Sequence, residues 1–179
     1  MLANNQGRLI SLSSFFVNGE LRLAAVWVSN AGNQHKAWWW HPHVDAPTLG
    51  SMLDDNEGRL VSLSPYVVNG KLRLAAVWIS NTGSDSQDWW WHPDVDPQTL
   101  RTMLANNQGR LVCLNTYTIG NGRRYSAVWV SNTGPYAKAW WWHPDVDGET
   151  LGNMPKNNLG RLVSLDPFVV NGKTCYAAV

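Results

Sequence analysis

Pairs of short apolar runs separated by Asn-Gly recur along the chain. In the clearest case, Arg59–Val68 and Lys71–Ile79 are rich in β-branched, aliphatic and aromatic residues and flank Asn69-Gly70. A type I′ turn needs positive φ at both central residues, which Asn-Gly tolerates well. This pattern therefore predicts an antiparallel hairpin. The same dipeptide occurs at Asn18-Gly19 and Asn171-Gly172, and the third copy has a looser turn at Gly120-Asn121-Gly122.

A tryptophan-rich strand and a short helix are predicted after each hairpin. In the second copy the strand is Asp88–His92, and the helix covers Asp96–Leu104. Asp96 is a favourable N-cap and Pro97 suits the first helical turn. Apolar residues at spacings of three and four form one stripe of this helix: Leu100, Met103 and Leu104. In the third copy Pro155 takes the second stripe position, which predicts that its helix ends a turn early.

These elements repeat with a constant step of 51 residues. Gly-Arg begins each copy, at Gly7, Gly58, Gly109 and Gly160, and the fourth copy stops at Val179, one residue before its tryptophan is due. About three and a half copies are present, which predicts either a fragment of a longer array or a closed fold cut inside a repeat. A lone copy cannot bury its apolar face, so copies must pack side by side.

The predicted fold class is therefore α+β, with residues 1–179 forming a single repeat domain. Each 51-residue copy is expected to be an antiparallel three-stranded unit plus a short helix. The copies are expected to form a ring or a curved array. A propeller-like all-β arrangement is the alternative.

The order of these motifs resembles a known repeat family. Gly-Arg-Leu-Val-Ser-Leu, an aromatic residue, Arg-Leu-Ala-Ala-Val-Trp, a tryptophan-rich strand and a short helix follow one another in the second copy. This order is similar to the bacterial tandem repeat family that also forms the amino-terminal half of fungal polyglycine hydrolases. The resemblance implies a role in substrate recognition, because the chemistry of those hydrolases is attributed to a separate β-lactamase-like serine domain. The tripled tryptophan and the following His-Pro-x-Val-Asp depart from the family pattern.

Composition narrows the possible functions. Fourteen basic and thirteen acidic residues leave a net charge of +1, without the basic excess typical of phosphate-binding nucleic-acid proteins. No apolar run is long enough to cross a bilayer, and no signal peptide is visible at the start. The chain is accordingly expected to be cytoplasmic or a fragment of a secreted protein. Cys113 and Cys175 are too few for a disulfide framework or a four-cysteine zinc site, and Cys113 is expected to be a structural thiol.

The main candidate for a binding surface is the tryptophan strand. All twelve tryptophans occupy repeated positions, and Trp-Trp-Trp-His-Pro begins at Trp38, Trp89 and Trp140. Side chains alternate faces along a strand, so the middle tryptophan shares a face with the histidine. We expect this face to be open for ligand stacking. The alternative is that all three tryptophans of each strand are core. The predicted ligand-binding residues of this face are Trp39, His41, Trp90, His92, Trp141 and His143.

Other repeated residues have simpler interpretations. Trp27, Trp78 and Trp129 are predicted to be core. Arg22, Arg73 and Arg124 lie on the opposite parity to them, so they either rim a binding groove or are solvated. The strand-start arginines at positions 8, 59, 110 and 161 are expected to bind a neighbouring copy's aspartate or loop carbonyls. In His-Pro-x-Val-Asp the last aspartate is interpreted as a helix N-cap rather than a metal ligand, so neither a metal nor a cofactor is predicted.

The leading functional hypothesis is a non-enzymatic, multivalent binding module, lectin-like, with a glycan as ligand. The sequence lacks Ser-x-x-Lys, Gly-x-Ser-x-Gly and His-Glu-x-x-His, and its histidines repeat with the array instead of forming one asymmetric cluster. A second hypothesis is a protein- or peptide-recognition domain of a larger serine hydrolase, with a catalytic domain beyond Val179. A third is a structural repeat without a ligand. The sequence leaves the oligomeric state open.

Overall fold

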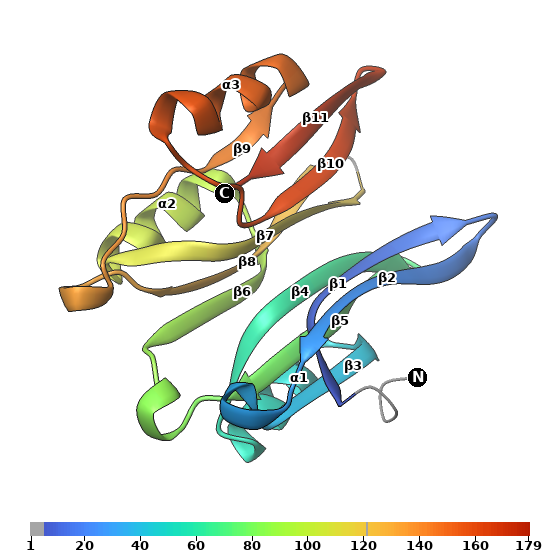
Figure 1. The fold of residues 1–179 in the computed structure, drawn as a ribbon. Coiled ribbons are helices and arrows are strands. Elements are labelled where there is room, and N and C mark those ends of the chain that lie inside the picture. The colour runs from blue at the N-terminus through green and yellow to red at the C-terminus, as the bar shows by residue number, and fades with distance from the viewer. Residues whose placement is uncertain (1–5, 121) are drawn as a thin grey trace. The chain divides into compact units, whose positions relative to one another are not determined.

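Each copy of the repeat contributes a β-hairpin, and most contribute a further strand and a helix as well (Figure 1). The computed structural model describes residues 6–120 and 122–179. The hairpins pair β1 (Gly7–Val17) with β2 (Glu20–Ser29), β4 (Gly58–Val68) with β5 (Lys71–Ser80), β7 (Gly109–Ile119) with β8 (Gly122–Ser131), and β10 (Leu165–Val170) with β11 (Lys173–Ala178). The remaining strands are β3 (Trp38–Val44), β6 (Trp89–Val95) and β9 (His143–Val146), and each is followed by a helix: α1 (Ala46–Asp55), α2 (Pro97–Asn106) or α3 (Gly148–Asn158). A 3-10 turn lies between hairpin and strand in each complete copy: η2 (Gly32–Gln34), η3 (Gly83–Asp85) and η4 (Gly134–Tyr136).

The hairpin turns adopt the conformation expected from their residues. Asn69 and Gly70 have φ of 51° and 71°, and the equivalent pairs at 18–19 and 171–172 are also positive at both positions. This left-handed conformation at two successive residues is the type I′ turn that matches the twist of the strands. In the third copy, Asn121 lies outside the described residues.

The helix starts are also as predicted, but one helix end is not. Asp96 is the N-cap of α2, and its Oδ1 accepts a hydrogen bond from the backbone N–H of Thr99 at 2.9 Å. Asp45 and Asp147 cap α1 and α3 through Thr48 and Thr150. The predicted early end of α3 is wrong, because this helix continues to Asn158. A proline removes one hydrogen bond and disfavours a helix interior, yet neighbouring bonds can carry the helix past it.

Antiparallel three-stranded sheets are present, but each combines strands of two copies. The strand orders are β3-β5-β4, β6-β8-β7 and β10-β11-β9, so each tryptophan strand pairs with the hairpin of the following copy. The prediction that one copy forms its own three-stranded unit is therefore wrong. Alternating side chains indicate which face of a strand is apolar, but they do not indicate which strand pairs with its edge. Helices α1 to α3 also exclude the all-β alternative.

Serine side chains join the first copy to the second. The Ser62 hydroxyl accepts a hydrogen bond from the Leu12 N–H at 3.0 Å and lies 3.3 Å from the Leu12 carbonyl oxygen. Ser64 accepts from the Ser14 N–H at 2.9 Å in the same way. One edge of β1 pairs with β2. The serine hydroxyls bind backbone groups on the other edge of β1, which would otherwise have no protein partner.

The third and fourth copies use the same contact. Ser164 accepts from the Leu114 N–H at 3.1 Å, at the same separation of 50 residues as Leu12 and Ser62. At the position equivalent to Ser64, the carboxylate of Asp166 instead accepts from the backbone N–H and the hydroxyl of Thr116 at 2.7 and 2.6 Å. Burial raises the pKa of Asp166 despite these two bonds.

Asp166→Ser is therefore expected to stabilise the protein at neutral pH. Because the folded-state pKa of Asp166 is raised, its contribution is most favourable below the unfolded-state pKa and is lost as pH rises through the folded-state pKa. Serine keeps an acceptor for Thr116, as Ser64 does for Ser14, without a buried charge. Urea unfolding at pH 3 and pH 7 measures this: the variant should gain stability at pH 7 and gain less, or nothing, at pH 3. An equal gain at both pH values would contradict the prediction.

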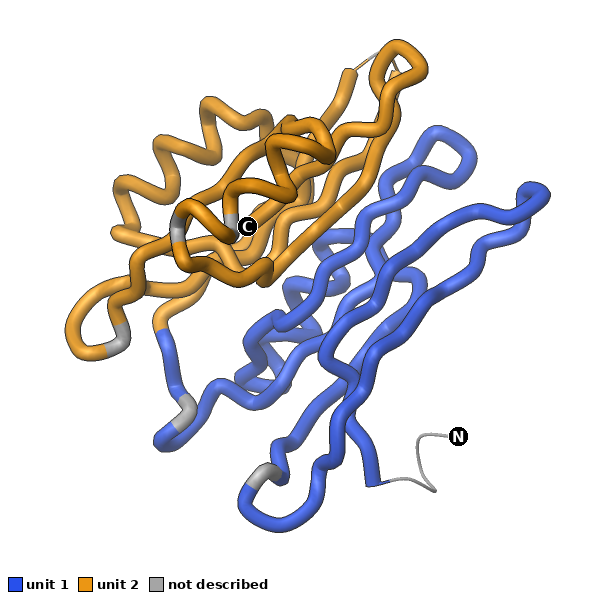
Figure 2. The backbone as a smooth tube through the Cα atoms, turned by 45° about the horizontal axis from the view of Figure 1, so that its top comes forward, with its two compact units in different colours: residues 1–87 blue, residues 88–179 orange. Residues whose placement is uncertain are grey.

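The repeat domain predicted over residues 1–179 divides into two compact units, residues 1–87 and 88–179 (Figure 2). In the first unit a buried cluster joins both copies: Leu9, Leu12, Tyr66, Ala75 and Val77. In the second unit the corresponding cluster joins the tryptophan strand, helix and hairpins, and Trp129 lies within it. The boundary directly precedes β6, so each unit holds one complete contact between consecutive copies.

Candidate functional site

The middle tryptophans of β3 and β6 are partly covered. Trp39 is half-buried and stacks on Trp78, with ring centroids 6.5 Å apart and an interplanar angle of 17°. Trp90 stacks on Trp129 in the same way, at 6.5 Å and 18°. Both pairs follow from the register, in which Trp39 lies opposite Trp78 and Trp90 opposite Trp129. The next hairpin thus supplies a second indole that stacks on one face of Trp39 and of Trp90.

Trp141 differs from its two equivalents. Its side chain is 47% exposed, while Trp140 and Trp142 pack against the core cluster of the second unit. β11 ends at Ala178, which lies opposite His143, so the described chain has no residue opposite Trp141. The predicted open indole is found at this position.

The tryptophans predicted to be core also divide into two groups. Trp78 and Trp129 are each 3% exposed, and their indole N–H groups donate to the side-chain oxygens of Asn56 and Asn107. Trp27 is 45% exposed, so its assignment to the core is wrong. Within the described residues β2 has β1 as its single neighbour, whereas β5 and β8 each lie between two strands.

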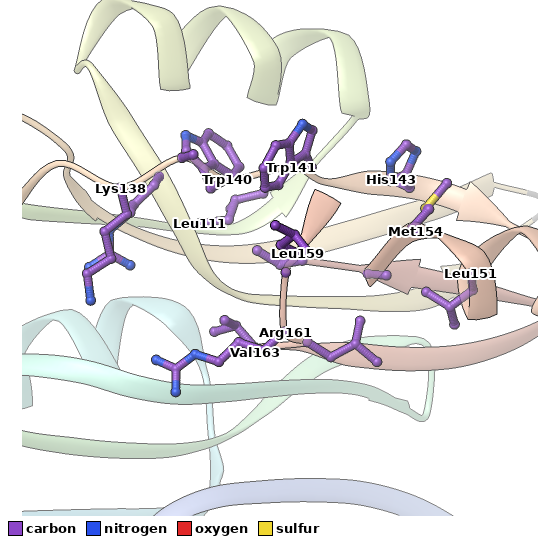
Figure 3. Close-up of a pocket in the computed structure, with 16 residues that line it drawn as sticks. Leu111, Lys138, Trp140, Trp141, His143, Leu151, Met154, Leu159, Arg161 and Val163 are labelled. Atoms are coloured by element: carbon purple, nitrogen blue, oxygen red, sulfur yellow. The ribbon is translucent and has the colours of Figure 1, made fainter. Parts of the chain in front are cut away.

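A cavity of about 600 Å³ lies beside Trp141 (Figure 3). Trp140, Trp141, Leu111 and Met154 give it apolar walls. Lys138, His143 and two strand-start arginines, Arg110 and Arg161, add polar and cationic groups to the same lining. An exposed indole next to several hydrogen-bond donors is a surface that can hold a ring with one apolar face and polar edges.

The first unit has a cavity of comparable size, about 690 Å³. The three tryptophans at 38–40 line it together with Asn30 and His35, and Trp40 is among the exposed large hydrophobic side chains. Each compact unit thus has a cavity lined by tryptophans of a Trp-Trp-Trp segment, but only Trp38–Trp40 lie in a strand, because β9 begins at His143, after the third segment. The two cavities differ in their polar residues, because the loops before the strands differ in sequence.

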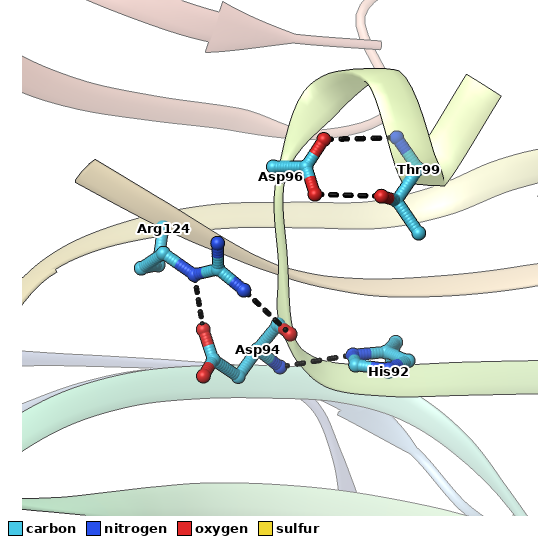
Figure 4. Close-up of polar contacts among 5 residues, drawn as sticks. All are labelled: His92, Asp94, Asp96, Thr99 and Arg124. Carbon is cyan, nitrogen blue, oxygen red and sulfur yellow. Dashed lines mark hydrogen bonds and ion pairs between the residues drawn. The ribbon is translucent and has the colours of Figure 1, made fainter. Parts of the chain in front are cut away.

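The histidines predicted to bind ligand have local structural partners in two copies. The Nδ1 atom of His41 accepts a hydrogen bond from the backbone N–H of His43 at 3.1 Å, and His92 accepts from Asp94 at 3.2 Å (Figure 4). Each bond spans the proline that follows the histidine and stabilises the backbone turn there. His143 lies in the lining of the Trp141 cavity, so it is the histidine of the three that the structure brings to a candidate site.

A polar cluster lies where the second tryptophan strand meets the third hairpin. Arg124 donates from Nε to the carboxylate of Asp94 at 2.6 Å and from a terminal nitrogen to the Asp94 carbonyl at 3.2 Å (Figure 4). Burial opposes ionisation of Asp94, but hydrogen bonds from Arg124 and Tyr117 keep its pKa below the ordinary value. Burial and the hydrogen bond to Asp94 raise the pKa of Tyr117, so its phenol stays neutral. This cluster joins two copies.

The other arginines of this series behave differently. Arg22 pairs with Glu20 at 2.6 Å on the surface, and Arg73 donates to the carbonyl of Leu72. At the cluster's equivalent in the first unit, His43 is 2.7 Å from the hydroxyl of Tyr66. Neither Arg22, Arg73 nor Arg124 is in the lining of either cavity, so the structure does not bring these three predicted residues to the candidate site.

The strand-start arginines differ in their surroundings within the described residues. Arg59 donates from Nε to the side-chain oxygen of Asn81 in its own copy at 3.0 Å. The Nε atoms of Arg8 and Arg110 are buried and have no hydrogen-bond partner among the described residues. Burial lowers the pKa of Arg110. Arg110 and Arg161 line the Trp141 cavity, a role that their spacing alone did not indicate.

The potential metal ligands and the two cysteines have the following arrangement in the described residues. The described residues contain no group of three or more His, Cys, Asp or Glu side chains placed to hold a metal ion. Cys113 and Cys175 are free thiols; Asn115 donates to the sulfur of Cys113 at 3.1 Å. Burial and the nearby Asp145 raise the pKa of Cys175, which favours the unreactive thiol. Within the described chain, no helix has the length and apolar character needed to span a bilayer.

Sequence reasoning missed the tyrosines between copies. Tyr66 donates to the carbonyl of Pro42 at 2.8 Å and Tyr117 contacts Asp94, so both tie a hairpin to the preceding His-Pro turn. Their equivalent in the fourth copy is Phe168, over which the guanidinium of Arg123 lies at 3.9 Å. The 51-residue spacing of these three aromatic residues was the available signal.

This architecture defines a repeat protein of antiparallel hairpins that are joined by tryptophan strands. Residues 59–81 and 106–132 each match the family described as the polyglycine hydrolase-like structural repeat. These segments cover most of the β4–β5 hairpin, and the β7–β8 hairpin together with the end of α2. The chain therefore carries this structural repeat, as the order of its motifs predicted. Comparison with curated proteins and with solved structures yields no match.

Proposed function

We propose that the chain is a non-enzymatic binding module that takes up a carbohydrate ring at Trp141. The observation that supports this proposal is an exposed indole in a cavity of about 600 Å³ that also contains His143 and Lys138. The C–H face of a sugar can stack on the indole, while its hydroxyl groups accept hydrogen bonds from the cationic side chains. Arg110 and Arg161 favour sugars that carry a carboxylate.

The second cavity makes the proposed module multivalent. Its three tryptophans and its histidine provide a related surface in the first unit. Affinity at one cavity is expected to be modest, and two linked cavities raise avidity on a surface that presents many glycans. We also propose that consecutive copies continue into a curved array or ring. The recurrence of the same serine contact within each unit supports this arrangement.

A glycan array with the full chain, followed by titration of the strongest ligands, tests the proposal. Trp141→Ser is expected to weaken binding about 5- to 30-fold, the effect of losing one stacking contact of roughly 1–2 kcal/mol. Phe16→Ser is the matched control, because Phe16 is also 47% exposed but lies outside both cavities. Absence of binding to any glycan, or equal losses in the two variants, would reject the carbohydrate site.

The match to the polyglycine hydrolase-like structural repeat favours a second candidate function, recognition of a protein or peptide substrate for a serine hydrolase. This function predicts a serine catalytic domain encoded after Val179 in the natural gene, and reading the gene tests it. It also predicts binding of glycine-rich peptides by the full chain, measured by calorimetry. A chain that binds neither glycans nor such peptides would be a structural repeat.

A further inference from the structure

The outer edge of β2 has no neighbour in the described chain, although its sequence equivalents β5 and β8 do. β5 pairs with β3 and β8 pairs with β6, in the same register: the middle tryptophan of the incoming strand lies opposite Trp78 or Trp129. β2 has a tryptophan at this position too, Trp27, and within the described residues it pairs with β1 alone.

Side chains of β2 are much more exposed than the equivalent side chains of β5, which a third strand covers. Val26 is 55% exposed and Trp27 is 45% exposed, while their equivalents Val77 and Trp78 are 0% and 3% exposed. Val28 is also among the exposed hydrophobic side chains of β2. Since the local sequences are nearly the same, this difference reflects the neighbours rather than the strand itself. An apolar strand with unpaired backbone groups is a template for another strand.

The occupant is indicated by what covers β5. Trp39 stacks on Trp78, the Ala37 carbonyl accepts from the Ser80 N–H at 3.0 Å, and Asn56 accepts from the Trp78 indole N–H at 3.0 Å. All three groups belong to one segment, residues 37–56, which contains β3 and α1. A single strand–helix segment therefore supplies the backbone pairing, the stacking partner and the indole acceptor.

We propose that the outer edge of β2 is a docking site for a tryptophan strand–helix segment of another copy of this repeat. The incoming strand adds to the β1–β2 hairpin as a third, antiparallel strand, with its middle tryptophan stacked on Trp27. The bound sheet then has the β3-β5-β4 arrangement of the second copy. The Trp141 cavity lies in the other unit.

The test uses a fluorescein-labelled peptide of residues 37–56 and the intact chain. Fluorescence anisotropy is expected to show saturable binding, and hydrogen-exchange mass spectrometry is expected to show new protection in residues 20–29. Trp27→Ser should weaken binding at least about tenfold. Phe15→Ser, on the same hairpin and likewise 45% exposed, should leave it unchanged. The peptide with Trp39→Ser should bind the wild-type chain as weakly as the wild-type peptide binds the Trp27→Ser chain.

Two results would overturn the proposal. The first is no binding, and the second is binding with protection outside residues 20–29. The glycan titration of Trp141→Ser is unaffected by any of these results.

Discussion

Trp78→Ala is expected to lower the free energy of unfolding of the first unit by about 3–5 kcal/mol, the usual cost of truncating a buried tryptophan. Trp78 is 3% exposed, stacks on Trp39 and donates to Asn56 at 3.0 Å. The substitution removes the stacking surface of Trp39 and the hydrogen-bond donor to Asn56, and it leaves a cavity beneath helix α1. Hydrogen exchange of residues 1–87 under increasing urea measures the loss in this unit.

The chain contains a matched control for this experiment. Trp27 occupies the same place in the first copy, within the same Ala-Ala-Val-Trp sequence, but is 45% exposed. Trp27→Ala is expected to cost less than about 1 kcal/mol, as exposed substitutions usually do. Comparable losses in the two variants would mean that Trp27 is buried in solution, and the assignment of β2 as an open edge would then be incorrect.

Gly58→Ala is expected to destabilise the first unit by about 1–3 kcal/mol, as overpacking in a filled core does. A Cβ atom at Gly58 would lie 2.6 Å from Cδ1 of Trp78, and the Leu53 carbonyl oxygen closes the other side at 3.5 Å. The indole cannot move away easily, because Trp39 and Asn56 hold it in place. The glycine of the Gly-Arg pair is thus explained by the tryptophan that packs on it.

Two other glycines test this explanation. Gly50 lies in helix α1, and a Cβ atom at this position would have no other atom within 4 Å. Because alanine favours the helix more than glycine does, Gly50→Ala should stabilise the unit by up to about 1 kcal/mol. At Gly7 the nearest atom, Cδ1 of the exposed Trp27, is 3.3 Å away, and Gly7→Ala should cost less than Gly58→Ala. Chemical denaturation of the three variants ranks them, and a Gly58→Ala variant as stable as the parent would contradict the packing argument.

Local structure could be predicted well from the residues. The Asn-Gly turns, the aspartate N-caps and the approximate bounds of the hairpins and of the first two tryptophan strands and helices follow from conformational preferences within a few residues. In the third copy the strand begins only at His143, after the tryptophans, and the helix runs on to Asn158. The 51-residue spacing also indicated that copies must pack on one another, because no copy can bury its own apolar face. The candidate site was predicted only in part: Trp39, Trp141 and His143 line the two cavities, while Arg22, Arg73 and Arg124 do not.

Tertiary structure decided which strands pair and which indoles remain open. Trp27, Trp78 and Trp129 lie in nearly the same local sequence, yet Trp27 is exposed and the other two are buried. Local pattern sets the face on which a side chain points, whereas burial depends on the distant strand and helix that cover that face. A tryptophan strand pairs with the next copy's hairpin, so each copy completes its neighbour. Within the described residues β2 pairs with β1 alone, and Trp27 and Trp141 are both exposed.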